Sequence, residues 1–368
     1  MHTAKSVDFE GSNYTHGTLL MPAVWLIDAY RAGERAQVRA LVDALGWPCE
    51  TRVLQYRKAV FWPHLLGQAS VAGITAESAA ALRAPWPDLV VSSGVRNEPV
   101  CRWICEKSGG KTRYVHVGRP WGSLDSFDLV ITTPQYRVPD HPHVLNNLLT
   151  LHGIDDAALE EARSRWQSTF DELPRPLFAV IVGGDSGPFT LGPKAAARLG
   201  REASQLAQSQ GGSLLVTTSS RTRDSAVRAL QQSITVPNYF YPWRAGDPDN
   251  PYRGILACAD RLIVTGDSIA MLSEACATGK QVKIFDLGGM REHFEIAERD
   301  FRMGASLYAL LMRWLWQPLS RDITLVHRRL RESGSAVWMD EILGTARVRA
   351  ESDLQRAVNA VKRLFGEC

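Results

Sequence analysis

The sequence predicts an α/β protein made of two doubly wound domains, each with a parallel sheet that helices cover on both faces. Three observations support this prediction. The chain has 368 residues, which exceeds one typical hydrophobic core and favours two domains of roughly 150 residues. Short apolar runs alternate with helical stretches along the chain. The alternation pauses at residues 173–176 (LPRP) and then starts again.

The composition excludes several classes of protein. Hydrophobic residues make up 45% and charged residues 22% of the chain, as in ordinary globular proteins. The net charge of +3, without Lys/Arg-rich runs among aromatic residues, predicts no nucleic-acid partner. None of the 6 cysteines forms a CxxC pair, so we expect reduced thiols in a cytoplasmic protein and no bound metal. The oligomeric state stays open.

The first domain is expected over residues 21–172, after a flexible polar lead at residues 1–20 that lacks a signal-peptide core. Each strand in it runs into a turn of small or polar residues, and a helix follows most of these turns. The predicted strands lie within residues 24–27, 51–54, 87–94, 112–117 and 129–132, and the predicted helices cover 34–45, a stretch from about 99, and 160–170.

The second domain is expected over residues 173–345 and repeats this order. Its predicted strands cover residues 178–182, 213–217, a short stretch near 236, 262–265 and 282–285, and its helices cover 194–209 and 269–278. Residues 346–368 are predicted to add a C-terminal helix that packs back across the cleft between the domains. Its apolar face consists of Leu354, Val358, Val361 and Leu364.

Three strands of the second domain end in Gly, Ser, Thr and Asp residues. Because parallel strands end at one edge of a sheet, we expect these turns to lie together and bind phosphate. Plain strand-to-helix turns are the alternative. The residues are Gly183, Gly184, Asp185 and Ser186, then Thr218, Ser219, Ser220, Arg221 and Thr222, then Gly266, Asp267 and Ser268.

The helix predicted at residues 269–278 carries two further candidates. Ser268 is suited to cap its N-terminus through a side-chain hydrogen bond. Met271 and Glu274 lie three residues apart and therefore share one face of the helix. We expect Glu274 to bind the hydroxyl groups of a ribose, with a solvated helix residue as the alternative.

The first domain carries candidates for an acidic ligand and for a general base. Arginines suit a phosphorylated or acidic ligand if they face the cleft, although scattered surface arginines are as consistent with the pattern. The candidates for this side are Arg31, Gly33, Gln37, Arg96 and Arg119. The general base is predicted among Asp28, Glu34 and His116, of which His116 lies in a predicted strand and also fits a core position.

Residues 307–316 (LYALLMRWLW) form the most apolar stretch. They are about half the ~20 residues that a membrane span needs. They therefore predict either a buried or interface helix, or a helix that rests on a membrane surface.

Several segments in order carry a resemblance to a known family. The chain resembles the ELM1-like family, which is named for a plant mitochondrial fission factor and whose bacterial members are regarded as glycosyltransferases. The segments are Asp28 with residues 31–33 and 37, then 87–100, 115–136, 182–189, 217–222, 250–260 and 264–279.

The resemblance implies a GT-B arrangement: two Rossmann-like domains with an interdomain cleft, in which the second domain binds a nucleotide-sugar donor. The segment that ends at Glu274 and Gly279 is similar to the donor motif of the peptidoglycan N-acetylglucosaminyltransferase. By that similarity Glu274 holds the ribose, and Ser268 and the Gly183 loop hold the diphosphate.

We expect metal-independent sugar transfer from a nucleoside-diphosphate sugar to a cell-envelope acceptor. The acceptor is expected to be a glycolipid at the inner face of the cytoplasmic membrane, with the Trp-rich stretch 313–316 helping it to dock. A nucleotide-sugar epimerase on the same fold and a non-catalytic adaptor are the alternatives.

Overall fold

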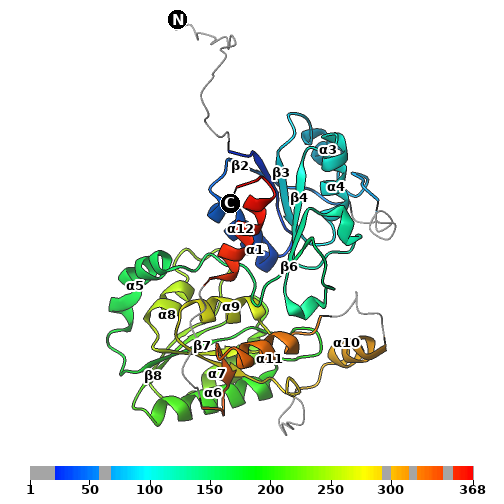
Figure 1. Ribbon diagram of the computed structural model, residues 1–368. Coiled ribbons are helices and arrows are strands. Elements are labelled where there is room, and N and C mark those ends of the chain that lie inside the picture. Colours follow the sequence, from blue (N-terminus) through cyan, green and yellow to red (C-terminus); the bar gives the residue numbers. More distant parts are fainter. Residues whose placement is uncertain (1–20, 58–67, 292–299, 315–320, 343–350, 368) are drawn as a thin grey trace, which may run out of the picture.

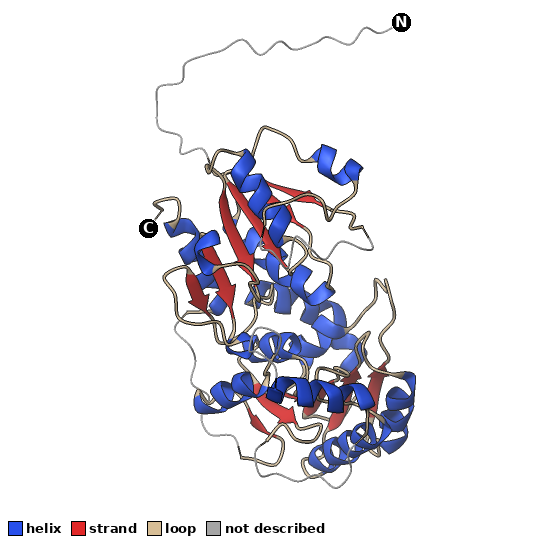
Figure 2. Cartoon of the chain, turned by 90° about the vertical axis from the view of Figure 1, so that its right-hand side faces the viewer, coloured by secondary structure: helices blue, strands red, loops and turns tan. Residues whose placement is uncertain are grey.

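The computed structural model describes residues 21–57, 68–291, 300–314, 321–342 and 351–367, without the side chains of residues 309–314. These residues form two parallel six-stranded sheets with helices on their faces, stacked one above the other in Figures 1 and 2. This is the predicted α/β class, with two Rossmann-like domains in a GT-B arrangement. The predicted lead at residues 1–20 lies outside the described residues.

The first sheet has the order β2-β1-β3-β4-β5-β6. The strands at residues 24–27, 89–93 and 129–132 are buried along their whole length because helices cover both faces, which explains their largely apolar sequence. The strands are β1 (Val24–Ile27), β2 (Cys49–Arg52), β3 (Leu89–Ser93), β4 (Arg113–Val117), β5 (Leu129–Thr132) and β6 (Val144–Asn146). The helices are α1 (Ala32–Leu45), α3 (Ala76–Ala81) and α4 (Glu98–Lys107), with 3-10 turns at Leu124–Ser126 and Pro134–Tyr136.

The second sheet has the order β12-β11-β10-β7-β8-β9. The three strands whose ends carry the Gly, Ser, Thr and Asp turns are therefore adjacent, as the sequence predicts. The strands are β7 (Leu177–Ile181), β8 (Ser213–Thr217), β9 (Asn238–Tyr241), β10 (Arg261–Thr265), β11 (Gln281–Phe285) and β12 (Val337–Trp338). The helices are α5 (Asp156–Phe170), α6 (Pro193–Gln208), α7 (Asp224–Ser233), α8 (Tyr252–Cys258), α9 (Ile269–Ala277), α10 (Met303–Trp314) and α11 (Thr324–Glu332).

Helix α5 lies on the other side of the domain boundary from the one expected. Its buried residues Leu159, Ala162 and Phe170 belong to the hydrophobic cluster of the second sheet, as does Leu148 before it. The chain therefore crosses from the first domain to the second near Leu148, ahead of α5, instead of near residue 172. The charged sequence of α5 conceals this, because only a narrow stripe of it packs on the second domain.

The last helix, α12 (Asp353–Arg363), returns to the first domain and packs beside α1 (Figure 1). Val358 and Val361 are buried in one cluster with Val38 and Leu41 of α1, and Leu354 and Leu364 pack against its edge. The apolar face predicted from the sequence is thus the face that packs, and it covers the first sheet.

The chain passes between the domains twice, near Leu148 and again before α12, and Asp353 links these two segments. Its carboxylate accepts hydrogen bonds from the backbone N–H groups of Leu148 (3.2 Å) and Leu149 (2.9 Å). Its backbone carbonyl accepts one from the side-chain amide of Asn147 (3.0 Å). The Asp353 side chain is only 5% exposed, so water does not readily replace these bonds.

The apolar stretch 307–316 lies mainly in α10. Leu307 is 57% exposed, whereas the residues from 315 on, and with them part of the predicted docking stretch 313–316, lie outside the described residues. Among the described helices, none combines the length and the apolar character that crossing a bilayer requires.

We predict that Asp353→Ala lowers the free energy of unfolding by about 1–3 kcal/mol, because it leaves two buried N–H groups without an acceptor. Urea denaturation followed by tryptophan fluorescence measures the change. Asp140→Ala is the matched control, since Asp140 is exposed, and it should change stability by less than about 0.5 kcal/mol. Equal urea midpoints for the two variants would contradict the role given to Asp353.

Candidate functional site

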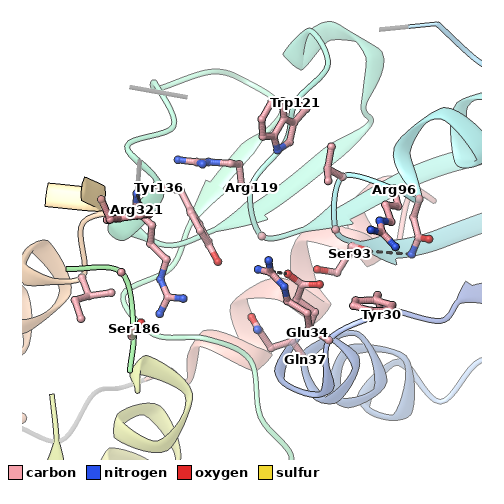
Figure 3. Close-up of a pocket in the computed structure, with 18 of the residues that line it drawn as sticks. Tyr30, Glu34, Gln37, Ser93, Arg96, Arg119, Trp121, Tyr136, Ser186 and Arg321 are labelled. Carbon is pink, nitrogen blue, oxygen red and sulfur yellow. Dashed lines mark hydrogen bonds and ion pairs between the residues drawn. The ribbon is translucent and has the colours of Figure 1, made fainter. Parts of the chain in front are cut away.

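Two pockets open between the domains, and the start of α1 reaches both. The larger encloses about 520 Å³, and we call it the arginine pocket (Figure 3). The smaller encloses about 310 Å³, and we call it the helix-end pocket because the N-terminus of α9 lines it. Arg31 and Glu34 line the first pocket, and Gly33 lines the second. The two pockets are therefore neighbours at one helix end.

The arginine pocket collects most of the residues predicted for the acceptor side. Four of the five, Arg31, Gln37, Arg96 and Arg119, line it beside the predicted base Glu34, whereas the fifth, Gly33, lines the helix-end pocket. In Figure 3, Arg96 and Tyr30 lie on one side of Glu34, and Arg119, Tyr136 and Arg321 lie on the other. The second domain contributes the turn at residues 186–189, including Ser186, and Arg321.

Contacts between the domains close one end of this pocket. The Arg321 Nε donates to Gln135 Oε1 at 2.6 Å. Beside this bond, the Arg137 Nη2 lies 2.5 Å from Asp322 Oδ2, and the Asp322 backbone N–H donates to the Gln135 carbonyl at 2.8 Å. These bonds fix the segment around Arg321 against the first domain.

Glu34 is the one carboxylate among the described residues that line the arginine pocket. Burial raises its pKa, and the positive charges of Arg31 and Arg321 oppose that rise. A Cβ at Gly94, whose φ is +86°, would lie 3.1 Å from Glu34 Oε2, so a glycine at the end of β3 leaves room for the carboxylate. A raised pKa makes a carboxylate a stronger base than usual, which suits a general base.

His116 and Asp28 do not line either pocket. His116 is completely buried, and burial lowers its pKa to about 4. Its Nε2 donates to the Arg119 carbonyl at 3.0 Å, and its Nδ1 accepts from the Tyr114 hydroxyl at 3.0 Å. The Asp28 Oδ1 accepts from Arg35 Nε at 2.9 Å. Of the three predicted bases, only Glu34 faces the pocket.

A buried carboxylate, that of Glu98, holds the loop that carries Arg119. It accepts backbone hydrogen bonds from Trp121 and Gly122, both at 2.9 Å. Burial raises the pKa of Glu98 to about 7, and these two N–H groups counteract the rise. Together with His116, Glu98 fixes residues 118–122 at the rim of the pocket.

The helix-end pocket is lined by the first turn of α9. Ser268 occupies the N-cap position, but its side chain makes no capping hydrogen bond, contrary to the prediction. The first N–H groups of a helix have no partner within the helix. Ser268, Ala270 and Met271 therefore present a polar, electropositive helix end to the pocket.

Glu274 faces the same pocket one turn further along α9. The Tyr252 hydroxyl donates a hydrogen bond to Glu274 Oε2, and burial raises the pKa of Glu274 while this bond opposes the rise. Trp243, which is 42% exposed, and Asn250 complete this side of the pocket. The arrangement offers a carboxylate, an aromatic face and a helix end within one cavity.

The Gly183 loop cannot hold a phosphate in the way that the resemblance implies. The Gly183 N–H already donates to Thr265 Oγ1, and the Gly184 N–H to Asp267 Oδ2, both at 2.8 Å. The buried Asp267 is in turn paired with Arg221, whose Nη2 lies 3.0 Å from Oδ2. The three strand ends thus satisfy one another and form the floor beneath the pocket.

The hydroxyl groups after β8 have similar structural roles. Ser219 Oγ donates to the Gly183 carbonyl at 2.9 Å, Thr222 Oγ1 donates to the same oxygen, and Thr218 Oγ1 accepts from the Trp243 N–H at 2.9 Å. Of the predicted donor residues, those that line the helix-end pocket are Thr218, Ser219, Ser220, Arg221, Ser268, Met271 and Glu274. Those that line neither pocket are Gly183, Gly184, Asp185, Thr222, Gly266 and Asp267.

Sequence reasoning missed Glu98, Tyr252 and Arg321. Tyr252 and Glu98 lie within segments that carry the family resemblance. Those segments could have placed both residues near a site, but they do not indicate what the two side chains do there. Arg321 follows a stretch outside the described residues and has no motif around it. Only the contact between the domains brings it into the pocket.

A family profile described as "Mitochondrial fission ELM1" matches residues 32–319. The chain belongs to this ELM1 family. The Mitochondrial fission protein ELM1 of Arabidopsis thaliana is 27% identical over 308 residues, which cover 74% of this chain and 70% of that protein. The profile match includes parts of both domains and most residues that line the two pockets, whereas Tyr30, Arg31, Arg321 and Ile323 lie outside it.

Solved structures are similar at lower identity. The UDP co-structure of MnaA from S. aureus has a TM-score of 0.44 and 12% identity, and covers 95% of this chain and 98% of that one. A UDP-glucosyltransferase from Polygonum tinctorium has a TM-score of 0.47 and 11% identity, and covers 95% of this chain and 100% of that one. The fold of this ELM1 member is established by its own two parallel six-stranded sheets.

Titration of Glu98 yields a pH-dependent prediction. Its pKa is about 7 in the folded protein, against 4.5 for the free carboxyl. Between these pH values the folded state holds more protons than the unfolded state, so this group lowers stability as pH rises. The free energy of unfolding of Glu98→Gln, relative to wild type, should therefore rise by about 2–3 kcal/mol between pH 4.5 and 7.

Urea denaturation across pH 4.5–8 tests this prediction. His116 is present in both proteins, so its own titration largely cancels in the difference. Glu106→Gln is the control, because Glu106 is exposed on the same helix. A difference between Glu98→Gln and wild type that stays constant over the whole range would refute the raised pKa.

Proposed function

We propose that this protein transfers a sugar from a nucleoside-diphosphate sugar to an acceptor hydroxyl group, without a metal ion. The observation that carries the proposal is the pair of adjoining pockets at the start of α1, one lined by a helix end and one by Glu34. A transferase needs such a division, because donor and acceptor must meet at one carbon atom while each is held separately.

The donor occupies the helix-end pocket. Its diphosphate lies at the N-terminus of α9, where open N–H groups and the helix dipole stabilise negative charge. Glu274 accepts hydrogen bonds from the ribose hydroxyl groups, and Trp243 offers a face on which the base stacks. The charge that develops on the leaving diphosphate is stabilised by these groups in place of a metal ion.

The acceptor occupies the arginine pocket with its hydroxyl group near Glu34. The hydroxyl oxygen forms a bond to the anomeric carbon of the sugar, and the bond from that carbon to the diphosphate oxygen breaks. The bonding electron pair leaves with the diphosphate, and the hydroxyl proton moves to the Glu34 carboxylate. The raised pKa of Glu34 supports this role.

The acceptor is a cell-envelope glycolipid, and the protein works at the inner face of the cytoplasmic membrane. Three exposed apolar side chains support this part of the proposal: Phe301 (81% exposed), Met303 (78%) and Leu307 (57%). Tyr308, next to Leu307, lines the arginine pocket. An apolar surface beside the acceptor pocket suits an acceptor with a lipid tail.

We predict that one nucleoside diphosphate stabilises the protein against heat and that Glu274→Gln abolishes most of this effect. A ligand at 100 times its Kd stabilises the folded state by about 2.7 kcal/mol, so the loss is measurable as a shift in Tm. The panel comprises UDP, ADP, GDP, CDP and TDP, each with Mg²⁺ and with EDTA.

Glu332→Gln serves as the control, because Glu332 is exposed on α11 and lines neither pocket. It should keep the full shift. If no diphosphate stabilises the wild-type protein, the donor site does not exist, and a surface-binding adaptor becomes the better explanation of the family resemblance.

We also predict that Glu34→Gln lowers the rate of sugar transfer by about 10²–10⁴-fold, the usual contribution of a general base. The measurement is the release of nucleoside diphosphate from the sugar donor with extracted envelope lipids as acceptor. The Tm shift with the diphosphate should remain, because Glu34 is not in the donor pocket.

Glu77→Gln, an exposed position on α3, is the matched control for this variant. Undiminished transfer by Glu34→Gln would exclude Glu34 as the base. Turnover of the donor without any acceptor would instead indicate an epimerase.

A further inference from the structure

We infer that the arginine pocket binds a phosphate group, which the acceptor carries beside the hydroxyl group that receives the sugar. Only the assignment of this phosphate to the sugar acceptor rests on the proposed function. The phosphate site itself follows from the charges, contacts and burial of the pocket residues.

The pocket holds an excess of positive charge. Arg31, Arg96, Arg119 and Arg321 line it, against the single carboxylate of Glu34 among the described lining residues. Glu34 lies 3.6 Å from Arg31, which accounts for one pair. Arg96 and Arg321 make no ion pair with any described residue. An anionic ligand would give these two guanidinium groups the ionic partner that no described residue provides.

Two of the guanidinium groups also act on each other. Burial lowers the pKa of Arg119, and the nearby positive charge of Arg321 contributes to lowering it further. These two arginines come from different domains and are brought together by the contact of Arg321 with Gln135. A dianion between them would remove the repulsion and would form charge-assisted hydrogen bonds to both.

The arginine side chains are already oriented by their neighbours. The Arg96 guanidinium lies 5.0 Å from the centre of the Tyr30 ring and 6.0 Å from that of Tyr56. The Arg119 guanidinium lies 5.6 Å from the centre of the Tyr136 ring. Stacking fixes the planar guanidinium groups, so that less entropy is lost when they bind an anion.

A buried support holds the Arg119 loop in place. Glu98 binds the N–H groups of Trp121 and Gly122, and His116 binds the Arg119 carbonyl. Surface arginines have no such support. The pocket therefore has the preorganised arrangement of an anion-binding site, which solvated surface arginines lack.

Phosphate fits this site better than a carboxylate does. A phosphate monoester carries a charge of about −1.5 to −2 at pH 7 and three acceptor oxygens. Arg96, Arg119 and Arg321 can therefore each address an oxygen of one group. Both a lipid phosphate and a soluble sugar phosphate present this chemistry.

Isothermal titration of the full chain tests the inference, with glucose 1-phosphate and with geranylgeranyl phosphate in detergent as the two probes. The wild type should bind at least one of them. Arg96→Gln and Arg321→Gln should each weaken that binding at least tenfold, and Arg96→Lys should weaken it less than Arg96→Gln. Arg228→Gln, at an exposed position on α7, should bind like the wild type.

The stronger probe identifies the source: preference for geranylgeranyl phosphate indicates a lipid, and preference for glucose 1-phosphate indicates a soluble acceptor. Binding of neither probe by the wild type overturns the inference, and so does binding that both glutamine variants retain. A melting curve of each variant shows that it is folded.

The outcome is separable from that of the donor site. Glu274→Gln should leave phosphate binding unchanged, and Arg96→Gln should leave the Tm shift with the nucleoside diphosphate unchanged. Phosphate binding without a diphosphate response would therefore reject sugar transfer and keep the anion site. The reverse result would reject the anion site alone.

Discussion

The structure depends on how the strand ends of the second sheet satisfy their own buried polar groups. The ends of β7, β8 and β10 bind one another through Gly183, Gly184, Ser219, Thr265 and Asp267. Unpaired N–H groups at this depth would each cost about 1–3 kcal/mol. With these groups paired, the N-terminus of α9 and the turn after β8 line the helix-end pocket.

The two walls of the cleft differ in the kind of charge that they offer. The second domain presents a helix end, whose partial charge has a fixed position and suits a ligand of constant shape. The first domain presents guanidinium groups stacked on aromatic rings. Arg321 is the exception, because the second domain supplies it to the wall of the first. The charge of the arginine pocket is thus complete only when the domains are in contact.

Most of the fold was predictable from the sequence, because buried parallel strands leave continuous apolar runs such as residues 178–182 and 213–217. The close placement of the three strand-end turns was also predictable. The sequence could not reveal that the hydroxyl and carboxyl groups of those turns bind each other instead of a ligand, as Asp267 and Ser219 do. The sequence also placed α5 in the wrong domain, because its many charged residues obscure the narrow apolar stripe that packs on the second domain. Residues such as Arg321 enter the site through a contact between domains, and local patterns do not record such contacts.

The return of α12 to the first domain makes that domain discontinuous in the chain. The second domain, from α5 to β12, is one uninterrupted segment of the chain with its own hydrophobic cluster. The first domain lacks Val358 and Val361 of its core until α12 has been synthesised. During translation the second domain is therefore complete before the first, although most of it comes later in the sequence. Until α12 is synthesised, part of the apolar surface of α1 stays exposed.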